Sequence, residues 1–200
     1  MSKFVLIRSI IITIVVVLPT CTNTLFSSQY QNATAQTSVA TTSNFLTYIN
    51  HIYGIKIRYP ADWRLGEHHY TNRFAVDFIS TSKNNSDTAP ATITLSVETL
   101  KQNKTLNGFT IGNLAKARQS LPGFQLIQSN ATTLASTPAH KIIYFFSSAD
   151  PTIQLPFISM NIWTIKQSKV YSISYTEAKP QYVKYLPITQ KMIDSFELIK

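Results

Sequence analysis

The chain has 200 residues, enough for one domain with its own hydrophobic core, and a formal net charge of +9 at neutral pH. Charged residues make up 14% of it, below the roughly 25% of typical soluble domains. Ser, Thr, Asn and Gln supply the remaining polarity, a balance that suits an extracytoplasmic protein. A single cysteine, Cys21, excludes an intramolecular disulfide and a metal site made of several cysteines. The basic residues are scattered, so we interpret them as solubility charge.

The first residues have the composition of an export signal. Two basic residues precede an apolar run over residues 10–18, which is the length of a signal-peptide core and shorter than the roughly 20 residues of a membrane-spanning helix. We therefore predict a signal peptide or a lipoprotein leader over residues 1–21. Leu18 stands three residues before Cys21, as in lipoprotein signals, which makes Cys21 a candidate for lipidation. The alternatives are that Cys21 is removed with the leader, or that the leader remains as an uncleaved anchor.

The segment after the leader, residues 22–44, is rich in Thr, Ser, Asn, Gln and Ala and contains almost no large apolar side chains. It can bury too little surface to offset the entropy lost on ordering, so we predict a flexible tether. Asn-x-Ser/Thr sequons would mark surface loops if the organism glycosylates its exported proteins. They occur at Asn32, Asn84, Asn103 and Asn130.

Residues 45–200 carry the periodicities of a single folded domain, without an internal repeat. The segment 48–59 alternates loosely and places Ile55, Ile57 and Tyr59 on one face, which predicts a half-buried strand with Tyr53-Gly54 as the turn into it. Pro60 cannot donate to a strand ladder and should end this strand. Trp63 then follows as a plug for the edge of the core.

Alternation and dense apolar runs predict the remaining strands at residues 73–80, 91–99, 124–129, 132–134, 141–146, 157–165 and 170–176. A turn is expected at residues 130–131 and a tight hairpin loop over residues 166–169. Thr110 is expected to cap a helix over residues 111–121, and a last helical region opens at Pro180, is interrupted at Pro187 and continues over residues 188–198. Runs of strands with few helices predict an α+β fold with a mostly antiparallel sheet.

Around the first strand, Tyr53-Gly54-Ile55 and Tyr59-Pro60-x-Asp62-Trp63 resemble the opening motif of the PsbP-like family. The resemblance implies an α/β/α sandwich around an antiparallel sheet, a fold shared with a Ran-binding nuclear import factor. The namesake of the family is an extrinsic subunit of photosystem II that supports calcium and chloride retention. That role is not transferred to this chain, because its leader looks like an export signal of a prokaryote, either bacterial or archaeal. Relatives of this fold occur as secreted proteins and lipoproteins without a photosystem.

One polar cluster, Glu67-His68-His69, could offer ligands to Zn²⁺ or Cu²⁺. Adjacent residues on an extended chain point in opposite directions, however, so we favour a solvated loop. His51 and His140 are isolated, and we interpret them as ordinary polar residues. The sequence lacks the nucleophile, phosphate-loop and calcium-loop motifs, so we predict no enzyme activity and no cofactor.

Aromatic and basic residues alternate near the C-terminus, a pattern that can bind sugars, lipids or single strands. The hypothetical binding face consists of Lys169, Tyr171, Tyr175, Lys184 and Tyr185. The alternative is that these aromatics belong to the core of the sheet and the last helix. The export leader argues against a nucleic-acid partner.

These observations predict a non-catalytic accessory or binding module that is secreted or anchored to the outer face of the cytoplasmic membrane. Its partner would be an extracytoplasmic protein complex or the membrane surface. The alternative function is binding of a small ligand or a metal ion, and a hydrolase comes third. The oligomeric state stays open.

Overall fold

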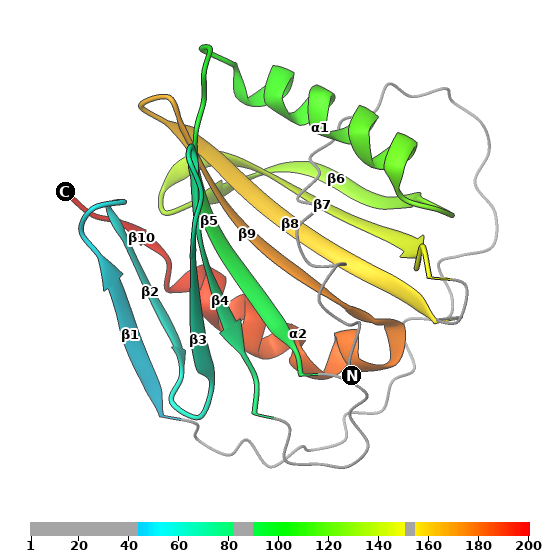
Figure 1. Cartoon of the computed structure of the whole chain (residues 1–200), viewed down its shortest axis with the longest axis horizontal. Helices are drawn as coiled ribbons and strands as arrows, with labels where there is room; N and C mark the ends of the chain where they lie inside the picture. Colours follow the sequence, from blue (N-terminus) through cyan, green and yellow to red (C-terminus); the bar gives the residue numbers. More distant parts are fainter. Residues whose placement is uncertain (1–43, 82–89, 151–154) are drawn as a thin grey trace.

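The computed structural model describes residues 44–81, 90–150 and 155–200 (Figure 1). The predicted leader, nearly all of the tether, Cys21 and the sequons at Asn32 and Asn84 lie outside the described residues. In chain order the elements are β1 Phe45–Asn50, β2 Ile55–Pro60, β3 Arg64–His69, β4 Arg73–Ile79, β5 Thr92–Thr99, α1 Leu106–Ser120, β6 Gln125–Leu134, β7 Thr137–Ser147, β8 Pro156–Lys166, β9 Lys169–Ala178, α2 Lys179–Asp194 and β10 Glu197–Leu198.

Two antiparallel sheets organise the described residues. The larger one has seven strands in the order β3-β4-β5-β9-β8-β7-β6, and the smaller one has the order β1-β2-β10. The two helices cover opposite faces of the larger sheet: on β8, Ile162 joins the core under α2, and its neighbour Trp163 packs beside Phe109 of α1 (Figure 1). The predicted α+β fold, with a mostly antiparallel sheet between helices, is confirmed.

The motif that opens the domain forms β2, as predicted. Ile55 and Ile57 are fully buried, and Pro60 is the last residue of the strand. Trp63 is also buried and meets the ring of Tyr185 edge to face at a centroid distance of 6.1 Å, so it joins β2 to α2.

The turn expected at Tyr53-Gly54 is confirmed. The loosely alternating residues before it form a strand of their own, so the segment folds into the β1–β2 hairpin. Asn50 ends β1, and its side-chain oxygen accepts hydrogen bonds from the backbone N–H groups of Ile52 and Tyr53. These bonds turn the chain before Gly54, which has a φ of +66°.

The predicted N-cap of α1 is also wrong. Thr105 caps the helix, since its hydroxyl accepts from the N–H of Gly108 at 3.0 Å. Thr110 lies one turn further on and is fully buried. Its hydroxyl donates to the carbonyl of Leu106 at 2.6 Å and accepts from the indole N–H of Trp163 at 3.1 Å. Thr110 therefore fixes α1 to the sheet.

The two short strands expected at 124–129 and 132–134 are one strand, β6, with a register irregularity between Leu126 and Gln128. The turn predicted at residues 130–131 lies instead at Ala135 and Ser136, which adopt φ values of 48° and 58°. The hairpin loop expected over residues 166–169 is confirmed, because β8 and β9 pair up to Lys166 and Lys169.

The last helix is longer and ends earlier than predicted. α2 continues through Pro187, which does not interrupt it. Because proline has no backbone N–H, the carbonyl of Val183 has no hydrogen-bond partner within the helix. Val183 and Pro187 are both exposed, so water can satisfy that carbonyl. The helix ends at Asp194, and the residues beyond form β10 against β2.

Candidate functional site

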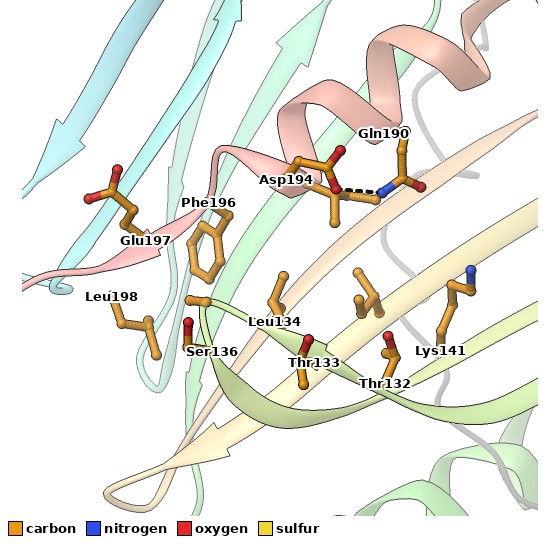
Figure 2. A pocket seen from close by; sticks show the side chains of 13 residues that line it. Thr132, Thr133, Leu134, Ser136, Lys141, Gln190, Asp194, Phe196, Glu197 and Leu198 are labelled. Atoms are coloured by element: carbon orange, nitrogen blue, oxygen red, sulfur yellow. Dashed lines mark hydrogen bonds between the residues drawn. The ribbon is translucent and has the colours of Figure 1, made fainter.

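A pocket of about 630 Å³ opens between the C-terminal turns of α2, the β6–β7 hairpin and β10; we call it the α2 pocket (Figure 2). It exists because α2 packs on β2, β8 and β9 and leaves the adjoining part of β6 and β7 uncovered. Its floor consists of Leu134, Ile162, Ile193 and Phe196, which are almost fully buried. The surface that the pocket exposes is therefore mostly polar and suits a polar ligand.

The cation of the α2 pocket is Lys141 on β7. In the sheet register it stands between Asn130 of β6 and Ile162 of β8, on the face that α2 covers. Within residues 44–81, 90–150 and 155–200 its ammonium has neither an ion pair nor a hydrogen bond. The ammonium is therefore available to an anionic group that enters the pocket.

The α2 wall of the pocket carries Gln190 and Asp194, which are one helical turn apart. The Gln190 amide donates to one Asp194 carboxylate oxygen at 2.7 Å, which holds both side chains over the opening (Figure 2). At the other end, Glu197 forms an ion pair with Lys56 at 3.0 Å, so its charge is already compensated. The hydroxyls of Thr132, Thr133 and Ser136 complete the polar lining.

This arrangement can recognise a compact polar group without any covalent step. Lys141 suits a carboxylate or phosphate, and the Asp194 carboxylate suits a hydroxyl or ammonium donor. The threonine hydroxyls can donate or accept, so the exposed lining offers mainly polar contacts. The pocket therefore fits a ligand that is anionic at one end and donates hydrogen bonds at the other.

The Glu67-His68-His69 cluster lies on strand β3, not on the loop that the sequence suggested. His68 points to one face of the sheet, where its Nε2 lies 3.1 Å from Asp77 Oδ2. Glu67 and His69 share the other face, with 3.5 Å between His69 Nε2 and Glu67 Oε2. Among the described residues, no group of three potential metal ligands converges, so the two histidines do not form one site.

Glu67 has a structural contact instead. The Tyr48 hydroxyl on β1 donates a hydrogen bond to the Glu67 carboxylate and so links the two sheets. Burial and this hydrogen bond raise the pKa of Tyr48 to about 12.

The hypothetical C-terminal binding face is not formed as a shared exposed surface. Tyr171, Tyr175 and Tyr185 are buried, with exposed fractions of 6%, 0% and 8%, and they belong to the core between the sheet and α2. Lys184 is exposed with its ammonium 5.0 Å from the centroid of the Tyr185 ring, and Lys169 lies at the β8–β9 turn. The structure therefore agrees with the alternative interpretation of these aromatics as core.

The residues of the α2 pocket were missed because they come from three separate segments. The one local signal was the spacing of Gln190 and Asp194, since residues four apart on a helix are neighbours on its surface. Lys141 lies in an apolar run that predicts a strand, and nothing in that run marks it as a binding residue.

Comparison with known proteins gives the family. A model of PsbP-like proteins matches residues 4–198. The chain belongs to the PsbP-like family. None of the curated proteins resembles the sequence closely enough to count as a relative. The match of a PsbP-like family model confirms the resemblance seen around β2.

Solved structures of low sequence identity share the PsbP-like fold. Cyanobacterial PsbP (CyanoP) from Synechocystis sp. PCC 6803 is 12% identical, with a TM-score of 0.56 over 84% of this chain and 98% of its own. LpqN from Mycobacterium tuberculosis is 19% identical, with a TM-score of 0.53 over 78% of this chain and 91% of its own. The Ran-binding protein Mog1p from Saccharomyces cerevisiae is 8% identical, with a TM-score of 0.53 over 79% of this chain and 97% of its own.

Neither described helix combines the length and the apolar character that crossing a bilayer requires.

Proposed function

We propose that this PsbP-like protein is a non-catalytic binding module that acts outside the cytoplasmic membrane and assists a protein complex there. The observation that carries the proposal is the ammonium of Lys141, which is without a partner in the described part of the chain and faces the α2 pocket. The described lining supplies charge, hydroxyls and an apolar floor but neither histidine nor cysteine. This chemistry suits recognition, with the pocket accepting an acidic group of the partner.

Three observations support a position outside the membrane. The first 21 residues have the pattern of an export leader. The match of the PsbP-like family model begins at residue 4 and so includes most of that segment. LpqN, which has the same fold, is described as involved in cell envelope biogenesis. Mass spectrometry of the mature N-terminus tests this part, because a processed export leader leaves a chain that starts after the leader or carries an acyl group on Cys21. An intact leader would be compatible only with the uncleaved anchor.

A second candidate function is binding of a free small molecule in the same pocket. Its volume of about 630 Å³ supports this alternative, since small-molecule sites commonly measure about 300–1,000 Å³. The ligand would again be anionic at one end and rich in hydroxyl or ammonium donors at the other.

Site-specific photo-cross-linking in the source organism separates these candidates. A photoreactive residue replaces Gln190, at the pocket, or Gln119, which is exposed on α1 and serves as the matched control. Protein adducts formed from position 190 and not from position 119 support the accessory module. A low-mass adduct at position 190 supports the small-ligand alternative. Adducts formed equally from both positions, or from neither, contradict a binding role for the pocket.

A further inference from the structure

The free edge of strand β1 is the least protected sheet edge in the described part of the protein. An edge strand presents unpaired N–H and C=O groups, and proteins usually protect it with charges, bulges or short length. β3 carries Arg64 and Glu67, β6 has a register irregularity, and β10 has only two residues. β1 has six residues, Phe-Leu-Thr-Tyr-Ile-Asn, with no charge, no proline and an uninterrupted register with β2.

Apolar side chains of β1 and its turn are exposed. Leu46 is 48% exposed, Ile49 is 47% exposed, and Ile52 in the following turn is 82% exposed. Among the described elements β1 pairs with β2 alone, and Figure 1 shows it as the outermost strand of the molecule. An uncharged six-residue strand with this composition pairs readily with another strand.

The register shows which backbone groups are free. The N–H of Ala61 donates to the carbonyl of Asn44, and hydrogen-bonded residues alternate along an antiparallel pair. The even-numbered residues of β1 therefore direct their backbone groups toward β2. The N–H and C=O groups of Phe45, Thr47 and Ile49 point to the open edge.

We propose that this edge is a self-association surface, on which β1 pairs antiparallel with β1 of a second copy. A two-fold axis at Thr47 places Thr47 opposite Thr47 of the other copy and Phe45 opposite Ile49. All three free N–H groups and all three free C=O groups of each edge then find partners. On the opposite face Leu46 meets Tyr48, so exposed apolar area is covered by apolar side chains. The two small sheets become one continuous six-stranded sheet.

Self-pairing satisfies every free backbone group of this edge and sets no like charges against each other. We therefore assign the edge to a second copy of this chain. Arg58 stands opposite Thr47 on β2, so the two Arg58 side chains of the dimer are three strand spacings apart, roughly 14 Å. That separation exceeds the screening length of about 8–10 Å at physiological salt. Lys56 is compensated by Glu197 in its own copy. No like charges meet within the paired strands. An interface of one strand pair is small, so the dimer is weak and concentration-dependent.

Disulfide trapping in the full chain tests the proposed register. Thr47→Cys places two thiols on directly opposed residues about 5.5 Å apart at Cα, within the range that a disulfide bridges. Ile49→Cys is the matched control, since it lies on the same strand and the same face. In the dimer, however, residue 49 of one copy lies four residues along the strand from residue 49 of the other copy. The unchanged chain reports any background from Cys21. We expect a cross-linked dimer for Thr47→Cys only. Equal cross-linking of both variants, or none for Thr47→Cys, would overturn the register.

Sedimentation velocity over about 10–500 µM tests the association itself, a range suited to a weak interface. Thr47→Glu gains an opposite charge, Arg58, across its own strand pair, so the fold is retained, but it sets two carboxylates against each other at the two-fold axis. We expect the unchanged chain to dimerise with rising concentration and Thr47→Glu to dimerise at least fivefold more weakly, with the same melting temperature or a higher one. Thr47→Val should dimerise like the unchanged chain. A chain that remains monomeric throughout, or dimers unaffected by Thr47→Glu, would contradict the proposal.

Discussion

Replacement of Thr110 by valine tests how α1 is held on the sheet. The valine side chain keeps the shape of threonine but cannot accept the hydrogen bond from the Trp163 indole N–H, which lies at 3.1 Å. Thr110 is fully buried and Trp163 is 1% exposed, so water cannot replace the lost acceptor. Leaving one buried donor unpaired costs about 1–3 kcal/mol.

At the middle of that range, the melting temperature should fall by roughly 4–8 °C, given about 2–4 °C per kcal/mol for a domain of this size. Thr110→Ser keeps the hydroxyl and should cost less, about 1 kcal/mol for the missing methyl group. In a Trp163→Phe background, which lacks the indole N–H, Thr110→Val should cost little. Thermal unfolding followed by circular dichroism measures the unchanged protein, the two single variants and the double variant of this cycle, together with Thr110→Ser.

Substitutions at Thr110 also distinguish its buried hydrogen bond to Trp163 from the N-cap role that the sequence suggested. An N-cap threonine tolerates aspartate, whereas a carboxylate buried against Trp163 would lower the melting temperature severely. Thr105→Ala should cost about 1 kcal/mol, because Thr105 is the observed cap. The reasoning is refuted if Thr110→Asp is as stable as the unchanged protein while Thr105→Ala has no effect.

Two further predictions concern stability. Gly54→Ala should lower the free energy of unfolding by more than about 1 kcal/mol, because Gly54 has a φ of +66° and an added Cβ would lie 2.9 Å from the Ile199 carbonyl oxygen. Gly112→Ala, on the open face of α1, should instead raise the free energy of unfolding by up to about 1 kcal/mol. Urea unfolding measures both, and effects of the same sign would contradict the backbone argument. Burial raises the pKa of Tyr48 and Tyr182 to about 12, so the stability that they contribute is complete below pH 10 and is lost as the pH rises from 10 to 12. Tyrosinate absorbance and circular dichroism should therefore change together in that interval, and ionisation of all tyrosines near pH 10 with the fold intact would contradict this.

Alternation and apolar runs in the sequence predicted the strands and the hairpin whose formation depends on neighbouring residues alone. β5 follows from strict alternation, and the β8–β9 hairpin follows from two apolar runs separated by polar residues. β6 and β7 were harder, because Asn130-Ala131 resembles a turn while the actual turn uses Ala135 and Ser136 at positive φ, which these residues seldom adopt. The beginning of α1 was misplaced because Thr110 is buried by tertiary packing that the sequence pattern does not show.

The candidate sites show the same division. The sequence argument that His68 and His69 point in opposite directions holds, because it needs only the geometry of a strand. The aromatic residues near the C-terminus were ambiguous, since burial decides between core and surface and depends on where α2 lies. The α2 pocket was not predictable, because Lys141, Gln190 and Asp194 meet only after β7 and α2 have packed on the same face of the sheet.

The most direct test of the binding account is a titration of the isotopically labelled protein with low-mass carboxylates, phosphates and acidic sugars, followed by NMR. We expect at least one of these classes to shift the amide signals of the pocket lining, including Lys141 and Gln190. Lys141→Met should weaken that binding by tenfold or more, as expected for a charge-assisted contact of about 1.5–3 kcal/mol, while Lys116→Met, an exposed position on α1, should leave it unchanged. Shifts confined to other surfaces, or binding that survives Lys141→Met at full strength, would contradict the assignment of the α2 pocket.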